Sequence, residues 1–285
     1  MKRLYKFAGI EVELFFMEES LYTEGSVLDA FQVETVDTPE KFEFYKVKKL
    51  DLPEGNLVAA FPGYRVYTQL DMQIRYIGTV SSSCESAYIR AEHRGKRHVI
   101  QVKESEHVAN NGTDSILNAL AAEHLVLEAD GVILHASFIE YNGQAILFTA
   151  PSETGKSTQA DLWKKHRDAE IINGDRAVIR LIDGKPFACG IPFAGSSKHC
   201  KNATLPLAAI VYLGQAKETT IRTFDFKTAF RKVWEGCTVN TWNPDDLNKA
   251  IDIVQNMTMQ VPVYDLQCTP DESAVIALEK ELEKI

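Results

Sequence analysis

The sequence is poor in cysteine and has no long hydrophobic run. Its five cysteines are scattered with no Cys-x-x-Cys pair, which predicts neither a disulfide framework nor a zinc site. Reduced thiols are the default in the cytosol. A signal peptide is not predicted, because the first apolar patch is short and is broken by Glu11 and Glu13. No apolar run approaches the roughly 20 residues of a membrane span, so we expect a cytoplasmic protein with no membrane partner.

Positive charges are outnumbered by negative ones. The 285 residues include 31 Lys and Arg against 40 Asp and Glu, which gives a formal net charge of −9. This balance argues against a broad nucleic-acid-binding surface, although it leaves room for a local basic pocket. Hydrophobic residues make up 45% of the chain and charged residues 25%, as in a soluble globular protein with one large domain or two ordinary ones.

The sequence does contain a phosphate-binding-loop pattern near its middle. An apolar run at 145–149 leads into the loop, and a helical run at 157–166 follows it. In such a context the loop N–H groups and the start of the helix hold phosphate oxygens. The predicted nucleotide-binding residues are Ala150, Pro151, Ser152, Glu153, Thr154, Gly155, Lys156, Ser157 and Thr158. We expect Lys156 to reach the β- and γ-phosphates and the Ser157 hydroxyl to hold Mg²⁺.

The loop departs from the usual pattern at its first position, where Ala150 stands in place of glycine. Glycine serves there for close backbone approach and free φ, so alanine fits only with a negative φ and with room for its methyl group. The alternative is a chance Gly-Lys-Ser in a surface turn. The strand before the loop and the helix after it favour a phosphate-binding loop.

A single acid follows the next predicted strand. The apolar run at 169–173 ends in Gly174, Asp175 and Arg176, and its spacing from Lys156 suits a neighbouring strand. An acid at this place can hold Mg²⁺ or accept a proton from an attacking hydroxyl. The plainer alternative is a turn aspartate that pairs with Arg176.

An Asn-Gly dipeptide predicts how the strand before the loop is paired. Strands at 132–141 and 144–149 flank Asn142 and Gly143, the strongest short hairpin signal. Successive strands would then be antiparallel, unlike those of a doubly wound Rossmann sheet. His135 lies in the earlier strand, either as a hydrogen-bonded core residue or as part of a site.

Two other regions carry weaker signals. A loop of small residues at 192–199 contains Lys198, a tentative substrate contact, although the loop suits a plain solvated surface equally well. Residues 1–112 alternate as strands do and carry no chemical motif. We expect this β-rich region to be a lid, a partner-binding surface or extra strands on a core formed by residues 113–285. Apolar spacing predicts one helical run from Ile116 to Glu128.

Taken together, these residues resemble the catalytic domain of HPr kinase/phosphorylase and its relatives. The resemblance spans roughly residues 116–213, and more loosely those up to 278. It is carried by His135, the loop at 150–158 and the Gly174-Asp175-Arg176 segment. It implies an α/β (mixed α+β) fold, with a phosphoenolpyruvate-carboxykinase-like P-loop kinase core and a mixed sheet, preceded here by the β-rich N-terminal region.

The resemblance also implies roles for single residues. Lys156 would contact phosphates, Ser157 and Asp175 would hold Mg²⁺, and His135 would lie near the transferred phosphate. The family has two adjacent acids where this chain has Gly174 and Asp175. The assignment of the base is therefore open, and Asp175 would serve either as both base and metal ligand or as metal ligand alone. Glu153 replaces a usual loop glycine and brings negative charge near the phosphates. The segment required for phosphorylase activity is not recognised, and HPr itself is not implied as the substrate.

The sequence therefore predicts a kinase that uses ATP and Mg²⁺ and phosphorylates a hydroxyl of a protein, a peptide or a small molecule. Its predicted catalytic residues are Asp175, Lys156, His135 and Arg176. A second hypothesis is a nucleotide-binding regulator with little or no phosphotransfer, which the residues at positions 150, 153 and 174 favour. A third, a plain interaction domain, predicts no ATP binding.

Overall fold

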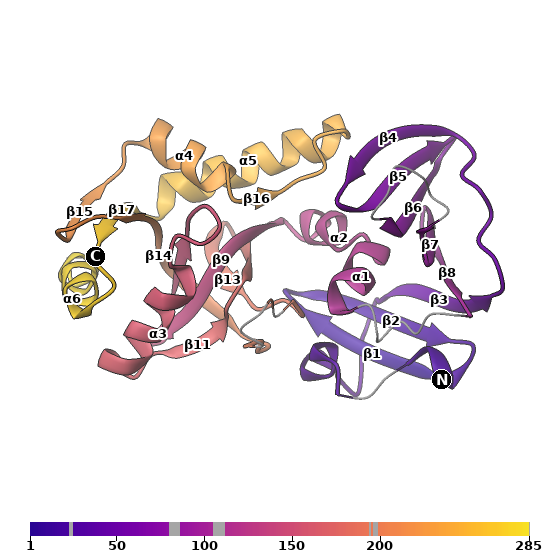
Figure 1. Ribbon diagram of the computed structural model, residues 1–285, viewed down its shortest axis with the longest axis horizontal. Coiled ribbons are helices and arrows are strands. Elements are labelled where there is room, and N and C mark those ends of the chain that lie inside the picture. Colours follow the sequence, from indigo (N-terminus) through magenta and orange to yellow (C-terminus); the bar gives the residue numbers. More distant parts are fainter. Residues whose placement is uncertain (23–24, 80–85, 105–111, 194, 196–198, 285) are drawn as a thin grey trace. The chain divides into compact units, whose positions relative to one another are not determined.

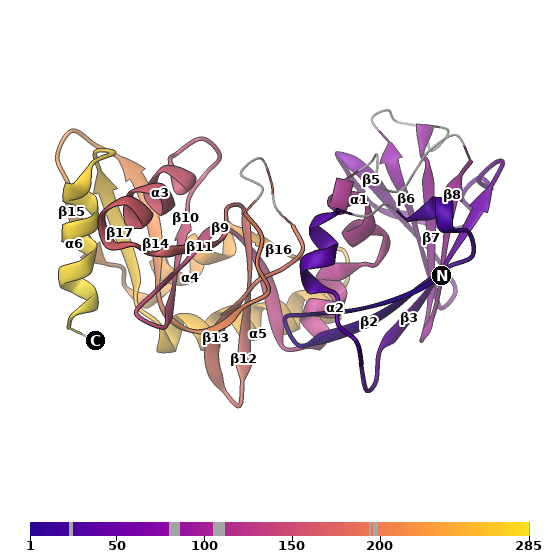
Figure 2. The same ribbon diagram turned by 90° about the horizontal axis from the view of Figure 1, so that it is seen from below.

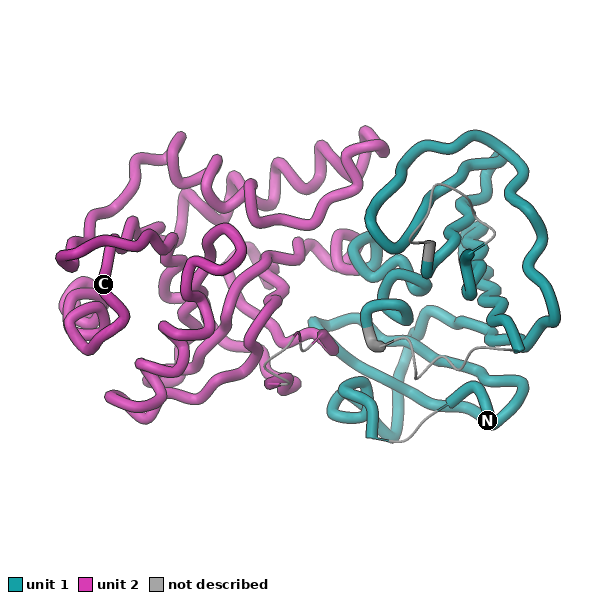
Figure 3. The backbone as a smooth tube through the Cα atoms, viewed as in Figure 1, with its two compact units in different colours: residues 1–125 teal, residues 126–285 magenta. Residues whose placement is uncertain are grey.

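The computed structural model describes all residues except 23–24, 80–85, 105–111, 194, 196–198 and 285 (Figure 1 and Figure 2). The chain forms two compact units, residues 1–125 and 126–285 (Figure 3). This division lies after α1 (Gly112–Ala119) and within α2 (Ala122–Glu128), whereas the sequence pattern placed the boundary after residue 112. Among the described residues, none of the helices combines the length and the apolar character needed to cross a bilayer.

Unit 1 is built on one eight-stranded mixed sheet in the order β1-β2-β3-β8-β7-β6-β5-β4. The strands are β1 (Lys2–Phe7), β2 (Ile10–Phe16), β3 (Glu40–Val47), β4 (Asn56–Phe61), β5 (Gly63–Gln69), β6 (Met72–Thr79), β7 (Ile89–Arg94) and β8 (Arg97–Lys103), and two 3₁₀ turns are η1 (Glu19–Leu21) and η2 (Val27–Phe31). Alternate residues of β2 are buried, as period-two patterning requires. The sheet confirms the predicted β-rich N-terminal region.

The predicted helical run from Ile116 to Glu128 is wrong in its continuity. The structure has two short helices, α1 and α2 (Ala122–Glu128), and Ala121 between them has a φ of 53°. A residue in this left-handed region cannot continue a right-handed helix. Neither glycine nor proline marks the break, so the sequence pattern gave no sign of it.

Two histidines, one half-buried and one buried, lie on neighbouring strands of the sheet of unit 1. His93 on β7 and His98 on β8 face each other with their Nδ1 atoms 3.0 Å apart. His98 Nε2 also lies 3.3 Å from Glu40 Oε2. Burial lowers the pKa of His93 well below its ordinary value, and the neighbouring charges of Arg75, His98 and His124 act in the same direction. Burial lowers the pKa of His98 too, although Glu40 opposes this effect.

We expect unit 1 to lose stability as the pH falls through the ordinary histidine pKa of about 6.5. Below that pH the unfolded chain binds protons that the folded His93 does not bind, at a cost of up to about 1.4 kcal/mol per pH unit for each such proton. The urea midpoint followed by circular dichroism should drop between about pH 7.5 and about pH 5.5. A His93→Gln variant should show a smaller drop.

The three tryptophans, Trp163, Trp234 and Trp242, all belong to unit 2, so their fluorescence reports on unit 2 as an internal reference. An unchanged midpoint for the wild-type protein, or the same drop in the His93→Gln variant, would contradict this pH dependence.

Unit 2 contains a nine-stranded mixed sheet whose path runs β10-β9-β12-β13-β14-β17-β15. Its strands are β9 (Gly131–Tyr141), β10 (Gln144–Thr149), β11 (Glu170–Asn173), β12 (Arg176–Ile182), β13 (Lys185–Cys189), β14 (Thr204–Gln215), β15 (Thr220–Thr223), β16 (Cys237–Thr238) and β17 (Val263–Cys268). β10 pairs antiparallel with β9 and parallel with β14, and β14 runs parallel to β17.

The predicted hairpin between β9 and β10 is confirmed. Asn142 and Gly143 have φ values of 52° and 76°, as both central residues of a type I′ turn require.

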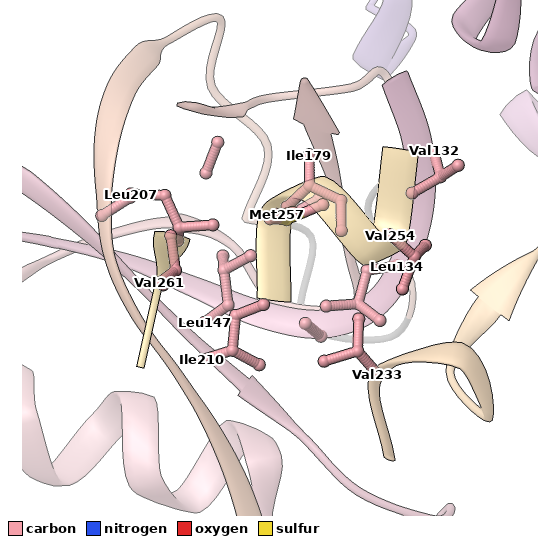
Figure 4. Close-up of a cluster of buried hydrophobic side chains, with 14 of the residues drawn as sticks. Val132, Leu134, Leu147, Ile179, Leu207, Ile210, Val233, Val254, Met257 and Val261 are labelled. Carbon is pink, nitrogen blue, oxygen red and sulfur yellow. The ribbon is translucent and has the colours of Figure 1, made fainter. Parts of the chain in front are cut away.

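Helices cover both faces of this sheet (Figure 1 and Figure 2). They are α3 (Lys156–Arg167), α4 (Phe226–Trp234), α5 (Pro244–Gln260) and α6 (Glu272–Leu282). Leu147 and Ile210 pack with Val254 and Met257 of α5 on one face (Figure 4). Trp163 of α3 packs with α6 on the other face. Each such buried side chain contributes about 1.5–3 kcal/mol, so the strand that feeds the loop is held from both sides.

Candidate active site

The segment predicted to be a phosphate-binding loop connects β10 to α3. Ala150 is nearly buried and lies outside the positive-φ region, so the backbone accepts alanine at this position. Glu153 has a φ of 63°, in the left-handed region that favours glycine, and its side chain is exposed. Gly155 precedes α3 with a φ of 115°. Glu153 therefore keeps the backbone conformation of a glycine while its carboxylate faces the solvent.

The start of α3 lacks a side-chain cap among the described residues, whereas α4, α5 and α6 are capped by Asp225, Asn243 and Asp271. The first N–H groups of a helix have no partner within the helix, and together they favour an anion. Ser157 and Thr158 are exposed in this first turn. The helix that follows the predicted loop therefore begins with backbone N–H groups that no capping side chain within the described residues occupies.

Lys156 lies across the loop. Its Nζ donates to the carbonyl oxygens of Ala150 at 3.1 Å and Pro151 at 3.4 Å, and only 8% of the residue is exposed. Burial lowers the pKa of Lys156, and the negative charge of Asp175 opposes that effect. The ammonium has exchanged water for two carbonyl oxygens, so the oxygens of a bound polyanion would be stronger partners for it.

Asp175 lies between a histidine and an arginine. Its Oδ1 is 3.3 Å from His135 Nε2, and its Oδ2 is 3.5 Å from Arg176 Nε. The β9–β12 pairing produces this arrangement, because His135 lies directly opposite Arg176. The hydrogen bond from His135 holds the pKa of Asp175 below its usual value against the effect of burial, and the charges of Arg176 and Lys156 also lower it. Asp175 is therefore a carboxylate at neutral pH.

A buried asparagine positions this turn. Asn173 Oδ1 accepts hydrogen bonds from the backbone N–H groups of Asp175 at 2.9 Å and Arg176 at 3.0 Å. Its Nδ2 donates to the carbonyl oxygens of Ile191 and Phe193. Asn173 was not among the predicted site residues, although a polar amide at the end of an apolar strand is a usable signal, since buried polar groups need partners.

A pocket of about 400 Å³ opens beside these residues. Its charged and polar lining includes His135, Arg176, Tyr212, Lys232, Glu235 and Thr238. Lys232 Nζ donates to the Tyr212 hydroxyl at 3.2 Å and lies 3.2 Å from Glu235 Oε2. Arg176 Nη1 donates to Thr238 Oγ1 at 2.9 Å. Two cations thus border the pocket next to the loop.

The structure brings Lys156, Asp175, His135 and Arg176 together, and it adds Lys232, Tyr212 and Thr238, which the sequence analysis missed. No local pattern singles out these three, because they reach the pocket from β14, α4 and β16. Lys198, the tentative substrate contact, lies outside the described residues.

A magnesium ion would find few protein ligands here. Over the described part of the chain, no group of three or more His, Cys, Asp or Glu side chains is placed to hold a metal. Mg²⁺ usually keeps several waters and binds through one or two protein groups plus substrate phosphates. The Ser157 hydroxyl and the Asp175 carboxylate fit that smaller requirement.

Comparisons with known proteins name one family. The solved structure of the Hpr(Ser) kinase/phosphatase from Coxiella burnetii is similar to this chain at 10% identity and a TM-score of 0.31, over 53% of this chain and 97% of that one. A likeness this weak carries no argument. No curated protein matches the chain. The model of the family described as SynChlorMet cassette protein ScmC matches residues 114–272. Because this segment is more than half of the chain, the chain belongs to that family.

Proposed function

We propose that unit 2 binds ATP with Mg²⁺ and transfers the γ-phosphate to a hydroxyl of a protein, a peptide or a small molecule. The observation that carries this proposal is the placement of Lys156. Its ammonium lies between the carbonyl oxygens of a loop, at the start of an uncapped helix, and within the electrostatic reach of Asp175. Enzymes that transfer phosphoryl groups use a cation, backbone N–H groups and a nearby carboxylate.

The proposal includes the fold of the core. β10 has an antiparallel neighbour in β9 and a parallel neighbour in β14, and the loop follows β10 directly. This mixed arrangement supports a phosphoenolpyruvate-carboxykinase-like P-loop core. The catalytic part would then lie within residues 113–285, which include all of unit 2.

In the proposed reaction the loop N–H groups and Lys156 bind the β- and γ-phosphates, and Lys156 exchanges its two carbonyl partners for phosphate oxygens. Ser157 and Asp175 would hold Mg²⁺, which when bound neutralises charge on the phosphates. The acceptor hydroxyl attacks the γ-phosphorus in line, the bond from the γ-phosphorus to the β-phosphate oxygen breaks, and ADP leaves.

The hydroxyl proton passes to Asp175, which His135 contacts at 3.3 Å. Arg176 and Lys232 lie where negative charge develops on the transferred group, and fixed cations in a half-buried pocket stabilise such charge better than water does. The first pocket therefore serves as the place of the acceptor.

A nucleotide-binding regulator is the second candidate function. Two observations favour it: Glu153 occupies a loop position that has the φ of a glycine and so adds a negative charge to the loop, and Gly174 stands where a second acid would be. Such a protein would bind ATP and hydrolyse it slowly or not at all.

One assay separates these functions. The protein is mixed with Mg²⁺, γ-labelled ATP and an extract of its source cells. Transfer of label to a protein, peptide or small molecule supports the kinase. Tight ATP binding by calorimetry with neither transfer nor ADP release supports the regulator. No ATP binding overturns both and leaves an interaction domain.

A further inference from the structure

A second pocket, of about 440 Å³, lies at the other end of the phosphate loop. The first pocket touches the loop at Ala150 and Pro151, whereas the second touches it at residues 153–155. The remaining walls of the second pocket come from the first turns of α3 and from the carboxyl ends of β14 and β17. A ligand that lies along the loop would have one end in each pocket.

The second pocket occupies the usual ligand position of a parallel sheet. β10, β14 and β17 run parallel, with Thr149 opposite Tyr212 and Gln215 opposite Cys268. Ligands of open α/β sheets bind outside the carboxyl ends of such strands. The pocket is therefore where the part of a nucleotide beyond its phosphates would extend.

The two pockets differ in charge. The first is lined by His135, Arg176, Lys232 and Glu235, which suit a reacting phosphoryl group. Of the residues that line the second, Glu153 is the one with a charged side chain, and that side chain is exposed. The rest of the wall is small or neutral, and Gly214 adds no side chain to it. An uncharged flat ring fits such a wall better than an anion does.

Gln159, which lines the second pocket, has one buried polar atom without a partner among the described residues. Gln159 is 3% exposed and its Nε2 donates to Cys268 Sγ at 3.3 Å, but its Oε1 has no hydrogen-bond partner within the described part of the chain. Buried polar atoms without partners are rare and call for a donor. Gln159 lies three residues after Lys156 on α3. A hydrogen-bond donor on a neutral ligand group would supply the missing partner.

We propose that this second pocket holds the adenine base, with Gln159 Oε1 accepting a hydrogen bond from its 6-amino group. This inference rests on the proposed function. Inosine triphosphate has the same phosphates but a carbonyl oxygen at position 6, so it would place two acceptors against each other. A site built to hydrogen-bond a group rejects the analogue that lacks it, because its buried polar atom stays unpaired.

The test is calorimetry of the full chain with Mg²⁺ and three ligands: ATP, inosine triphosphate and tripolyphosphate. ATP should bind roughly tenfold more tightly than inosine triphosphate, the effect of about one hydrogen bond. Gln159→Leu should bring the two nucleotides to about equal affinity and leave tripolyphosphate unchanged. Gln255→Leu, at an exposed position on α5, is the matched control and should change none of the three.

Several results would overturn the inference. If the wild-type protein binds inosine triphosphate as tightly as ATP, Gln159 makes no hydrogen bond to the 6-amino group. This comparison requires no variant. If ATP binds no more tightly than tripolyphosphate, the protein does not bind the base, although the loop still binds the phosphates. If the Gln159→Leu variant still binds ATP more tightly than inosine triphosphate, a residue other than Gln159 recognises the 6-amino group. If none of the three ligands binds, the loop does not bind phosphate and the proposed function is wrong as well.

Discussion

Replacing Lys156 with alanine should weaken ATP binding by roughly 100-fold and abolish phosphate transfer. The ammonium is nearly buried inside the loop, where a charge interacts more strongly with phosphate than it would in water. The variant should fold normally, because burial already lowers the pKa of Lys156, which means that the fold gains little from its charge. Calorimetry with Mg²⁺ and ATP measures the binding, and label transfer measures the reaction.

The matched control is Lys164→Ala. Lys164 lies in the last turn of the same helix and is exposed, so this variant removes one positive charge without touching the loop. It should bind ATP as the wild type does. If Lys156→Ala also binds ATP within about twofold of the wild type, the phosphate loop does not hold a nucleotide and the kinase proposal is wrong.

Asp175→Asn should lower the rate of phosphate transfer by roughly 10³-fold and change ATP binding much less. Asparagine keeps the shape of the side chain but lacks the charge proposed to hold Mg²⁺ and the carboxylate oxygen proposed to take the proton. The hydrogen bond from His135 keeps the pKa of Asp175 below its usual value, so protonation of Asp175 should not limit the wild-type rate between about pH 5 and about pH 8.

The control for this variant is Asp168→Asn. Asp168 is an exposed residue at the end of α3 with a φ of 54°, a conformation that asparagine also tolerates. The Asp168→Asn variant should transfer phosphate at the wild-type rate. Full activity in Asp175→Asn would remove this residue from the mechanism, whereas binding without transfer in both the wild type and the variant would favour the regulator.

The local elements around the loop could be predicted from the sequence. The predicted helical run at 157–166 corresponds to α3 (Lys156–Arg167), and the predicted strand at 144–149 corresponds to β10. Both predictions rest on short-range chemistry: Asn142-Gly143 for the turn, and Gly155-Lys156 for the helix start. The break at Ala121 was not predictable, because neither glycine nor proline marks it.

The sequence by itself determined the loop, its lysine and its hairpin neighbour, since these depend on residues that are close along the chain. Only the tertiary structure decided which side chains lie around them. Lys232 reaches the first pocket from α4. Gln159 donates a hydrogen bond to Cys268, which lies 109 residues further along the chain. Strand pairing and helix packing create these contacts, and no local spacing encodes which distant residues they bring together.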